Sequence, residues 1–233
     1  MHQTLPTLGV LVPSRGRPGN VGPLIESFHT RKNEGTELLI IIDDDDDTYE
    51  QYHWEWDLHR GSLVGALLTT ERLRLGGTLN KFGPEMANRY DIVGFMGDDH
   101  RPRTEGWDVE VAKACANTPN AVVYGNDLLQ GQALATAVFM DSAIIKALGY
   151  MVFPGGVHLF FDNFWMDIGR GLGTLTYLSD VIIEHVHPSA GKVEWDHGYN
   201  EVNSSDTWIM DENTYKEYVA YQLSNDVQRV RSY

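Results

Sequence analysis

Short apolar segments alternate with segments of helical periodicity along most of the chain, and this alternation constrains the fold more than any other feature. The segments 8–12 (LGVLV), 37–42 (ELLIII) and 91–96 (DIVGFM) are apolar at consecutive positions, as expected of strands buried on both faces. Helical patterns follow them at 20–31, 49–58, 79–89 and 106–117. Strands that alternate with helices predict an α/β fold with a mostly parallel, doubly wound sheet and helices on both faces.

The later segments extend the same pattern to the end of the chain. Further strands are predicted at 63–69, 121–124, 136–140, 174–177 and 181–184, and further helices at 141–148, 162–168 and 211–230. Gly76 and Gly77 predict a loop that opens the 79–89 helix. A chain of 233 residues without an internal repeat is expected to form a single domain.

The formal net charge of −15 argues against two classes of partner. Broad nucleic-acid binding needs clustered Lys and Arg, and an anionic membrane surface attracts basic segments. No apolar run approaches the roughly 20 residues that cross a bilayer, and the N-terminal segment lacks the pattern of a signal peptide. The single cysteine, Cys115, can form no internal disulfide. We therefore expect a cytoplasmic protein without membrane contacts, and the oligomeric state stays open.

Three of the apolar segments end in polar residues. Ser14-Arg15-Gly16-Arg17 follows the first, five aspartates at 43–47 follow the second, and Gly97-Asp98-Asp99-His100 follows the third. Parallel strands would bring these loops to one edge of the sheet, where α/β folds bind ligands. Adjacent carboxylates repel unless a cation joins them, and Mg²⁺ and Mn²⁺ prefer carboxylate oxygen. The pattern predicts a divalent-metal site, and a solvated acidic turn is the alternative.

Two pairs of basic side chains are further candidates for the site. Arg15 and Arg17 flank Gly16, a pattern that suits phosphate because Arg offers paired donors and Gly lets the backbone come close. His185 and His187 follow the 181–184 strand and face the same side of it. One of the two imidazoles is a candidate metal ligand, and exposed or structural histidines are the alternative.

Asp162 stands alone among aromatic residues in the segment 158–165 (HLFFDNFW). Aromatic faces pack on sugar rings, and a carboxylate among them can act as a general base. The competing interpretation places the aromatic side chains in the core and Asp162 at a helix N-cap.

Together these segments resemble the GT-A fold glycosyltransferases, specifically the family 2-like group, over residues 8–188. VPSRGRPGNVGPLIESF is similar to the group's first strand and helix, and LGGTLNKFGPEMANRYDIVGFMGDDH to the segment that leads into its acidic metal motif. IIKALGYM is similar to the helix and turn before the acceptor region, and EHVHP lies where several members supply a histidine to the metal. The resemblance implies a nucleotide-sugar-binding GT-A catalytic domain at 1–190, with 191–233 as a C-terminal loop and helix packed on it.

The resemblance also implies an activity, which is metal-dependent transfer of a sugar from a nucleotide diphosphate to an acceptor hydroxyl. Mn²⁺ or Mg²⁺ is the implied cofactor, a UDP-sugar is the favoured donor, and the acceptor is unidentified. The implied nucleotide-site residues are Pro13, Ser14, Arg15 and Arg17, with Asp44 or Asp45 near the base or ribose and Asn80 and Lys81 near the diphosphate. Asp98 and Asp99 would form the metal motif, His185 or His187 would complete it, and Asp162 would be the catalytic base.

Two positions depart from the family pattern. Gly97 replaces the first aspartate of the usual Asp-X-Asp, and Phe161-Asp162 holds one acid where the family has a pair. These departures keep a non-catalytic nucleotide- or carbohydrate-binding module as an alternative function. A nucleotidyltransferase that acts on sugar phosphates is the other alternative, because it too uses an α/β sheet, acidic metal ligands and a basic loop with glycine. The tail at 191–203 (GKVEWDHGYNEVN) resembles glycosyltransferase-like proteins of bacteriophages, which would place the chain in a host cytoplasm.

Overall fold

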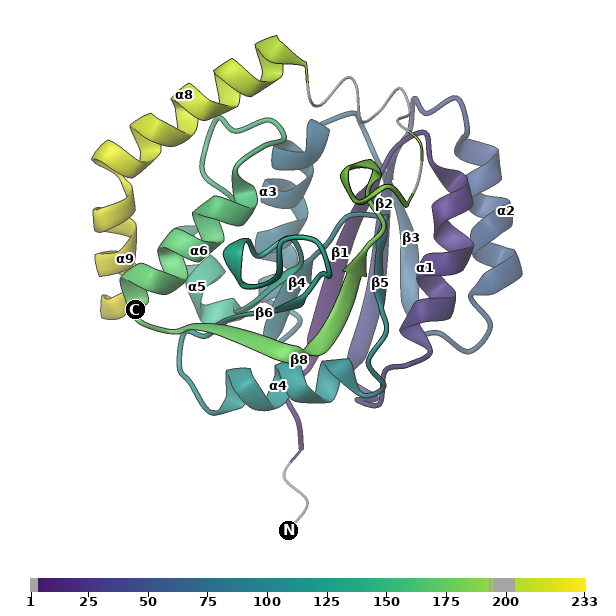
Figure 1. Cartoon of the computed structure of the whole chain (residues 1–233), viewed down its shortest axis with the longest axis horizontal. Helices are drawn as coiled ribbons and strands as arrows, with labels where there is room; N and C mark the ends of the chain where they lie inside the picture. Colours follow the sequence, from purple (N-terminus) through teal and green to yellow (C-terminus); the bar gives the residue numbers. More distant parts are fainter. Residues whose placement is uncertain (1–3, 193, 195–203) are drawn as a thin grey trace.

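A computed structural model describes residues 4–192, 194 and 204–233. At its centre is an eight-stranded mixed sheet with the strand order β3-β2-β1-β4-β7-β6-β8-β5 (Figure 1). The strands are β1 (Leu8–Ser14), β2 (Thr36–Asp43), β3 (Gly65–Thr70), β4 (Ile92–Phe95), β5 (His100–Pro102), β6 (Val122–Asn126), β7 (Val138–Asp141) and β8 (Leu175–His185).

The sheet is mostly parallel, as the sequence predicts. β1 lies between β2 and β4 and is parallel to both, and β2 is also parallel to β3. β7 is antiparallel to β4 and β6, and the short β5 is antiparallel to β8. The sequence pattern missed β5 altogether, and the two strands predicted at 174–177 and 181–184 are one continuous strand, β8.

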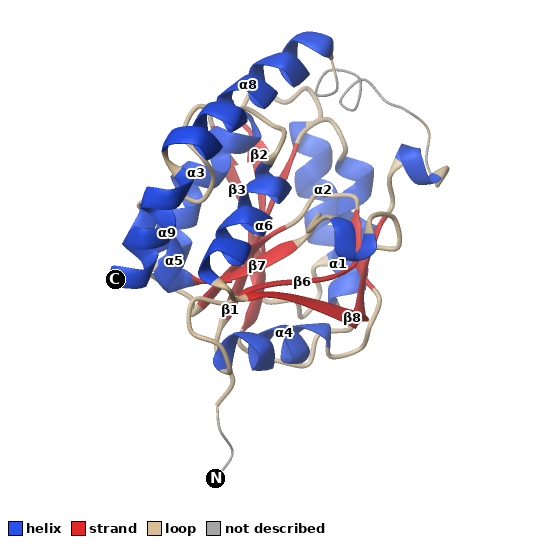
Figure 2. Cartoon of the chain, turned by 60° about the vertical axis from the view of Figure 1, so that its left-hand side comes forward, coloured by secondary structure: helices blue, strands red, loops and turns tan. Residues whose placement is uncertain are grey.

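Helices cover both faces of the sheet (Figure 2). Successive strand side chains point to opposite faces, so Leu11 joins one apolar core while Val10 and Val12 join the other. The core that contains Val10 is closed by α1 (Val21–Phe28), α2 (Tyr49–His59) and α4 (Trp107–Ala116). The core that contains Leu11 is closed by α3 (Arg74–Ala87), α5 (Ser142–Leu148), α6 (Phe161–Leu172), α8 (Ser205–Tyr221) and α9 (Leu223–Ser232).

Two of the predicted helices are organised differently in the structure. α3 begins at Arg74, so Gly76 and Gly77 lie inside its first turns and not in a loop. A side chain at position 76 would collide with the backbone carbonyl of Gly156, and the glycine therefore permits a close approach of helix and loop. The predicted final helix is two helices, because the backbone leaves the helical conformation at Gln222.

The two C-terminal helices pack on the core that contains Leu11. Val227 and Val230 are buried there, and the carboxylate of Asp226 accepts hydrogen bonds from the hydroxyls of Tyr150 and Tyr218. The tail at 191–203, whose resemblance to phage proteins is a sequence prediction, lies mostly outside the described residues. Among the residues that are described, no helix combines the length and apolarity that a membrane crossing requires.

Candidate functional site

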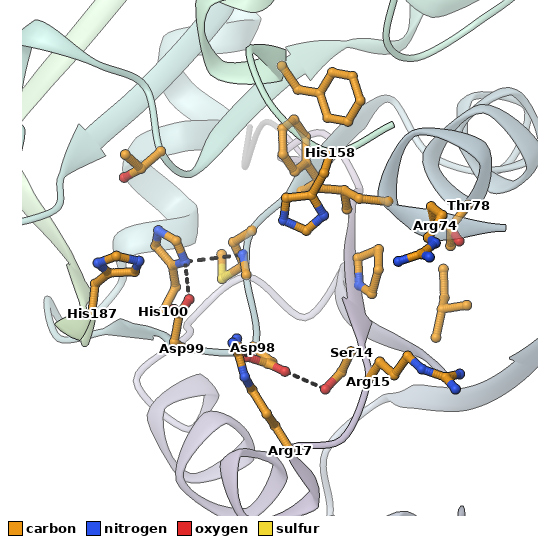
Figure 3. A pocket seen from close by; sticks show the side chains of 18 of the residues that line it. Ser14, Arg15, Arg17, Arg74, Thr78, Asp98, Asp99, His100, His158 and His187 are labelled. Carbon is orange, nitrogen blue, oxygen red and sulfur yellow. Dashed lines mark hydrogen bonds and ion pairs between the residues drawn. The ribbon is translucent and has the colours of Figure 1, made fainter. Parts of the chain in front are cut away.

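A cavity of about 850 Å³ opens at the carboxyl ends of the parallel strands β1, β2 and β4. The three polar loops that the sequence places at one edge of the sheet all line it, which confirms that part of the prediction. The lining residues include Pro13, Ser14, Arg15, Gly16 and Arg17 at the end of β1 and after it, Asp43, Asp46, Asp47 and Thr48 at the end of β2 and after it, and Gly97, Asp98, Asp99 and His100 from the end of β4 to the start of β5. Figure 3 shows Asp98, Asp99 and His100 on one side of the cavity and Arg15, Arg74 and Thr78 on the other.

The loops after β1 and β4 are joined through the buried carboxylate of Asp98. Ser14 Oγ donates to Asp98 Oδ2 and lies 2.7 Å from the hydroxyl of Tyr52. Asn20 Nδ2 donates to Asp98 Oδ1 at 3.1 Å, and Arg17 Nη1 lies 3.6 Å from the same oxygen. Burial and the neighbouring Asp99 raise the pKa of Asp98. Because its oxygens already have protein partners, Asp98 fixes the positions of the two loops.

Asp99 lies between two imidazoles. Asp99 Oδ1 is 3.3 Å from His100 Nδ1, and Asp99 Oδ2 is 3.3 Å from His185 Nε2. The two imidazole rings stack with centroids 4.1 Å apart because β5 and β8 place His100 directly opposite His185. One possible ligand atom from each of the three residues lies within 4.8 Å of the others.

The chemistry of this three-residue group fits a divalent metal ion. Burial opposes ionisation of Asp99, but the two imidazoles more than offset it and hold its pKa well below the usual range. Burial, together with His185, lowers the pKa of His100 and so favours a neutral ring. His100 Nε2 and His185 Nδ1 are buried and have no hydrogen-bond partner among the described residues. The neutral His100 ring, the His185 imidazole and an ionised carboxylate together are a donor set that Mn²⁺ and related ions accept.

Gly97, where the family pattern has an aspartate, leaves space for this group. A Cβ atom built at position 97 would lie 2.5 Å from Asp99 Oδ1 and 3.2 Å from His100 Nδ1. The backbone N–H of Gly97 donates to His100 Nδ1 at 3.1 Å. The departure from Asp-X-Asp therefore goes with a different set of candidate ligands, which includes His100.

Two residues to which the sequence pattern assigned no role, His100 and Asp127, contribute to the site: His100 lines the cavity, and Asp127 bonds residues of its wall. Asp127 Oδ2 is 3.9 Å from His185 Nδ1. The Asp127 carboxylate also accepts a hydrogen bond from Thr136 and three backbone N–H bonds from residues 129–131, and these bonds shape the wall of the cavity. The sequence feature that could have identified His100 as a site residue is its position directly after Asp98-Asp99. Asp127 follows a predicted strand in the same way.

Among the predicted histidines, His185 belongs to the three-residue group and His187 does not. His187 still lines the cavity, with its ring centroid 4.9 Å from that of His185. Its Nδ1 accepts a hydrogen bond from the backbone N–H of Ser189 at 3.1 Å.

Asp162 lines the cavity from the first turn of α6. Burial raises its pKa to about 7, with a further contribution from Asp127 and an opposing one from His185. The residue at the N-cap of α6 is Phe160, so Asp162 does not have the capping role of the competing interpretation. The competing interpretation also placed the aromatic side chains in the core, and those that follow Asp162 do lie there.

Only some of the five aspartates at 43–47 line the cavity. Arg15 pairs with Asp43 at 2.9 Å and with the carboxylate of Asp45. Asp46 accepts a hydrogen bond from the backbone N–H of Gly16 at 2.7 Å. Asp44 is exposed, and neither Asp44 nor Asp45 lines the cavity.

Asn80 and Lys81, expected near a diphosphate, do not line the cavity either. Asn80 Oδ1 accepts the backbone N–H groups of Met151 and Val152, each at 2.9 Å, so its side chain joins α3 to the loop after α5. Lys81 Nζ donates to Thr70 Oγ1 at 2.7 Å. The cations that do line the cavity on this side are Arg72 and Arg74, which the sequence analysis did not assign.

Comparison with solved structures identifies matches over nearly the whole chain. Mannosyltransferase PcManGT from Pyrobaculum calidifontis, in complex with GDP-Man and Mn²⁺, is 12% identical, with a TM-score of 0.59 over 98% of this chain and 74% of its own. S. aureus TarS 1–349 in complex with UDP is 13% identical, with a TM-score of 0.59 over 94% and 73%. Glucosyl-3-phosphoglycerate synthase from Mycobacterium tuberculosis, in complex with Mg²⁺ and UDP, is 12% identical, with a TM-score of 0.61 over 91% and 79%.

At these identities the matches establish the fold, and the predicted α/β fold of GT-A type is confirmed. No protein-family model matches the sequence, and a comparison with curated proteins finds no match.

Proposed function

We propose that this chain is a metal-dependent glycosyltransferase that moves a sugar from a nucleotide-diphosphate donor, with a UDP-sugar favoured, to an acceptor hydroxyl. One observation carries the proposal. The buried group Asp99, His100 and His185 lies in the same cavity as arginine side chains and as Asp162, whose pKa is about 7. A cation site, anion-binding groups and a base in one cavity are the parts that this reaction needs.

The donor diphosphate is expected to lie between the three-residue group and the arginines of the cavity. Arg15, Arg17, Arg72 and Arg74 all line this space in a chain with a net charge of −15. Such a local concentration of guanidinium groups favours a phosphate-bearing ligand, because Arg binds phosphate oxygens with paired donors. UDP is favoured as the nucleotide because TarS and glucosyl-3-phosphoglycerate synthase were solved with UDP, whereas PcManGT was solved with GDP-Man.

Asp99, His100 and His185 would hold Mn²⁺ or Mg²⁺. A divalent ion bound there would offset negative charge on the leaving diphosphate. Asp98, through its bonds to Ser14 and Asn20, keeps the loop that carries Asp99 in place. Asp127 lies on the far side of His185 and helps to orient its ring.

Asp162 is the proposed base. With a pKa of about 7, a large share of its carboxylate is ionised at neutral pH and accepts a proton readily. As the acceptor oxygen bonds to the anomeric carbon, the bond from that carbon to the diphosphate oxygen breaks. The hydroxyl proton passes to Asp162, and the nucleoside diphosphate leaves with the electron pair of the broken bond. A location in the cytoplasm, or in a host cytoplasm if the chain comes from a phage, stays a prediction.

Thermal melting with UDP and GDP, each with and without Mn²⁺, tests the donor site. Saturation at about 100 times Kd adds roughly 2.7 kcal/mol of stability, which raises Tm by about 5 °C or more in a domain of this size. The shift is expected to need nucleotide and metal together.

Matched variants assign the shift to the site. Asp99→Ala should abolish the metal-dependent part, and Asp57→Ala, which removes an exposed carboxylate on α2, should retain it. Equal shifts in Asp99→Ala and wild type would exclude the proposed metal group. Product analysis separates the alternatives, since a glycosyltransferase releases a nucleoside diphosphate and a nucleotidyltransferase releases pyrophosphate. Nucleotide binding without either product supports a binding module.

A further inference from the structure

Three aromatic side chains form a cluster at the edge of the cavity, beside the proposed base. Phe160 lines the cavity two residues before Asp162. Its ring stacks on Tyr215 with centroids 5.5 Å apart and an angle of 15°, and it meets the edge of Trp208 at 5.3 Å. We call Phe160, Trp208 and Tyr215 the aromatic platform.

The platform continues from the cavity onto the outer surface of the molecule. Phe160 and Tyr215 are half-buried, and Trp208 is 47% exposed. Ile209 and Met210, next to Trp208 on α8, are also exposed. Single exposed apolar side chains are common, but an exposed tryptophan in contact with a cavity-lining ring forms a continuous apolar surface.

The backbone fixes the platform relative to Asp162. Phe160 has a φ of 67°, in the left-handed region that glycine adopts freely and that strains a bulky residue. The buried carboxylate of Asp211 accepts the backbone N–H groups of Val157, His158 and Leu159, each at 2.8 Å. Asp211 lies one helical turn after Trp208, so these hydrogen bonds join α8 to the loop that leads to Asp162.

The charge around the platform disfavours a polyanionic ligand. The chain has a net charge of −15, Asp206 lies on α8 two residues before Trp208, and Glu212, further along the same helix, pairs with Lys216 at 3.0 Å. A phosphorylated polymer or an anionic lipid would be repelled there. A neutral sugar ring is not repelled. It offers one face of C–H groups that packs on aromatic rings, and its hydroxyls point outward at the rim of the ring.

We propose that the aromatic platform is the acceptor subsite and that the acceptor is a neutral oligosaccharide. One sugar ring lies on the ring of Trp208, and the next residue of the oligosaccharide passes Phe160 and reaches into the cavity with a hydroxyl toward Asp162. This inference rests on the proposed glycosyltransferase function and names the substrate class of the same site.

Binding of maltohexaose, cellohexaose and chitohexaose, measured by calorimetry with UDP and Mn²⁺ at saturation, tests the proposal. At least one hexaose is expected to bind wild type. Trp208→Ala should weaken that binding about tenfold, because covering roughly 55 Å² of apolar surface at about 25 cal/mol per Å² corresponds to that ratio. Trp208→Phe should recover most of the affinity, because it restores an aromatic face.

Tyr221→Ala is the matched control, since it removes an 81% exposed aromatic side chain from the last turn of the same helix. It should bind the hexaose as wild type does. Unchanged binding in Trp208→Ala, or no binding of any hexaose to wild type, would overturn the platform. A wild-type dimer in sedimentation that Trp208→Ala converts to a monomer would also overturn the platform. The exposed face of Trp208 would then be a contact between two copies of the chain.

Failure of the platform and failure of the donor site give different results. If UDP and Mn²⁺ still raise Tm in wild type while no hexaose binds, the glycosyltransferase proposal stands and the acceptor subsite falls. If neither nucleotide with metal nor any hexaose binds, both proposals fall. Melting of each Trp208 variant without ligands shows whether the variant is folded, and Trp208→Gln, which removes the aromatic face and keeps a long side chain, replaces Trp208→Ala if that protein is not folded.

Discussion

Replacing Gly97 by alanine is expected to remove metal binding while leaving the fold intact. The Cβ atom of the new residue would lie 2.5 Å from Asp99 Oδ1, whereas ordinary contact begins at 3.4 Å. The carboxylate must therefore move by about 0.9 Å, the difference between these two distances. The ring of His100, 3.2 Å from the same Cβ atom, limits the directions in which it can move.

The size of the effect follows from the tolerance of metal sites. Ligand distances are held to within about 0.2 Å, so a displacement several times larger removes Asp99 from the ligand set. Changes to groups that only orient a ligand cost about 10- to 100-fold in metal affinity, and loss of the charged ligand should cost at least that much. The fold should lose less than about 1 kcal/mol, because the displaced atoms are the end of a side chain that can rotate.

Titration of Mn²⁺, followed by the electron paramagnetic resonance of the free ion with UDP present, measures this affinity directly. Gly19→Ala is the matched control, because a Cβ atom at position 19 has no neighbour within 4 Å and the residue lies in the loop after β1. Tm values of the two metal-free variants should agree with that of wild type. Wild-type Mn²⁺ affinity in Gly97→Ala would refute the reasoning, because Asp99 could not then be a ligand in the observed position.

Three further outcomes test the rest of the site. Turnover should rise with pH through about 7, because only ionised Asp162 accepts a proton, and Asp162→Asn should lower turnover about 100-fold with unchanged nucleotide affinity; a flat pH–rate profile would exclude it as the base. Asp211→Ala should lower the free energy of unfolding in urea by about 3 kcal/mol, since three backbone N–H groups lose a charged acceptor. His185→Ala should abolish Mn²⁺ binding and His187→Ala should weaken it less; equal losses would place His187 among the ligands.

The sequence predicted the part of the site that strand direction determines. Parallel strands carry their following loops to the same edge, so the apolar segments and the polar residues after them were enough to bring Ser14, Asp98 and the aspartate run together. The same reasoning gave the two apolar cores, because continuous apolar segments bury both faces of a strand.

The direction in which a side chain points was not predictable from the sequence. Asn80 lies on the predicted helix, but its amide bonds the backbone of residues 151 and 152 and not the cavity. Lys81 donates a hydrogen bond to Thr70. Asp45 pairs with Arg15 but does not itself line the cavity. Each residue lies near its expected element. Its polar atoms point toward local hydrogen-bond partners, and the spacing of residues in the sequence does not reveal these partners.

Pairing between distant strands is the second feature that the sequence does not predict. It explains why His100 was missing from the predicted site, and why Gly97 stands where the usual motif has an aspartate. A three-residue strand such as β5 has no periodicity of its own, and only its antiparallel register with β8 brings His100 against His185. Once that ring occupies the space beside Asp99, a side chain at position 97 displaces the Asp99 carboxylate. The glycine and the histidine therefore depend on each other. Restoring the usual aspartate by Gly97→Asp should not restore a family-like site, because the added carboxylate would meet Asp99 before it met a metal ion.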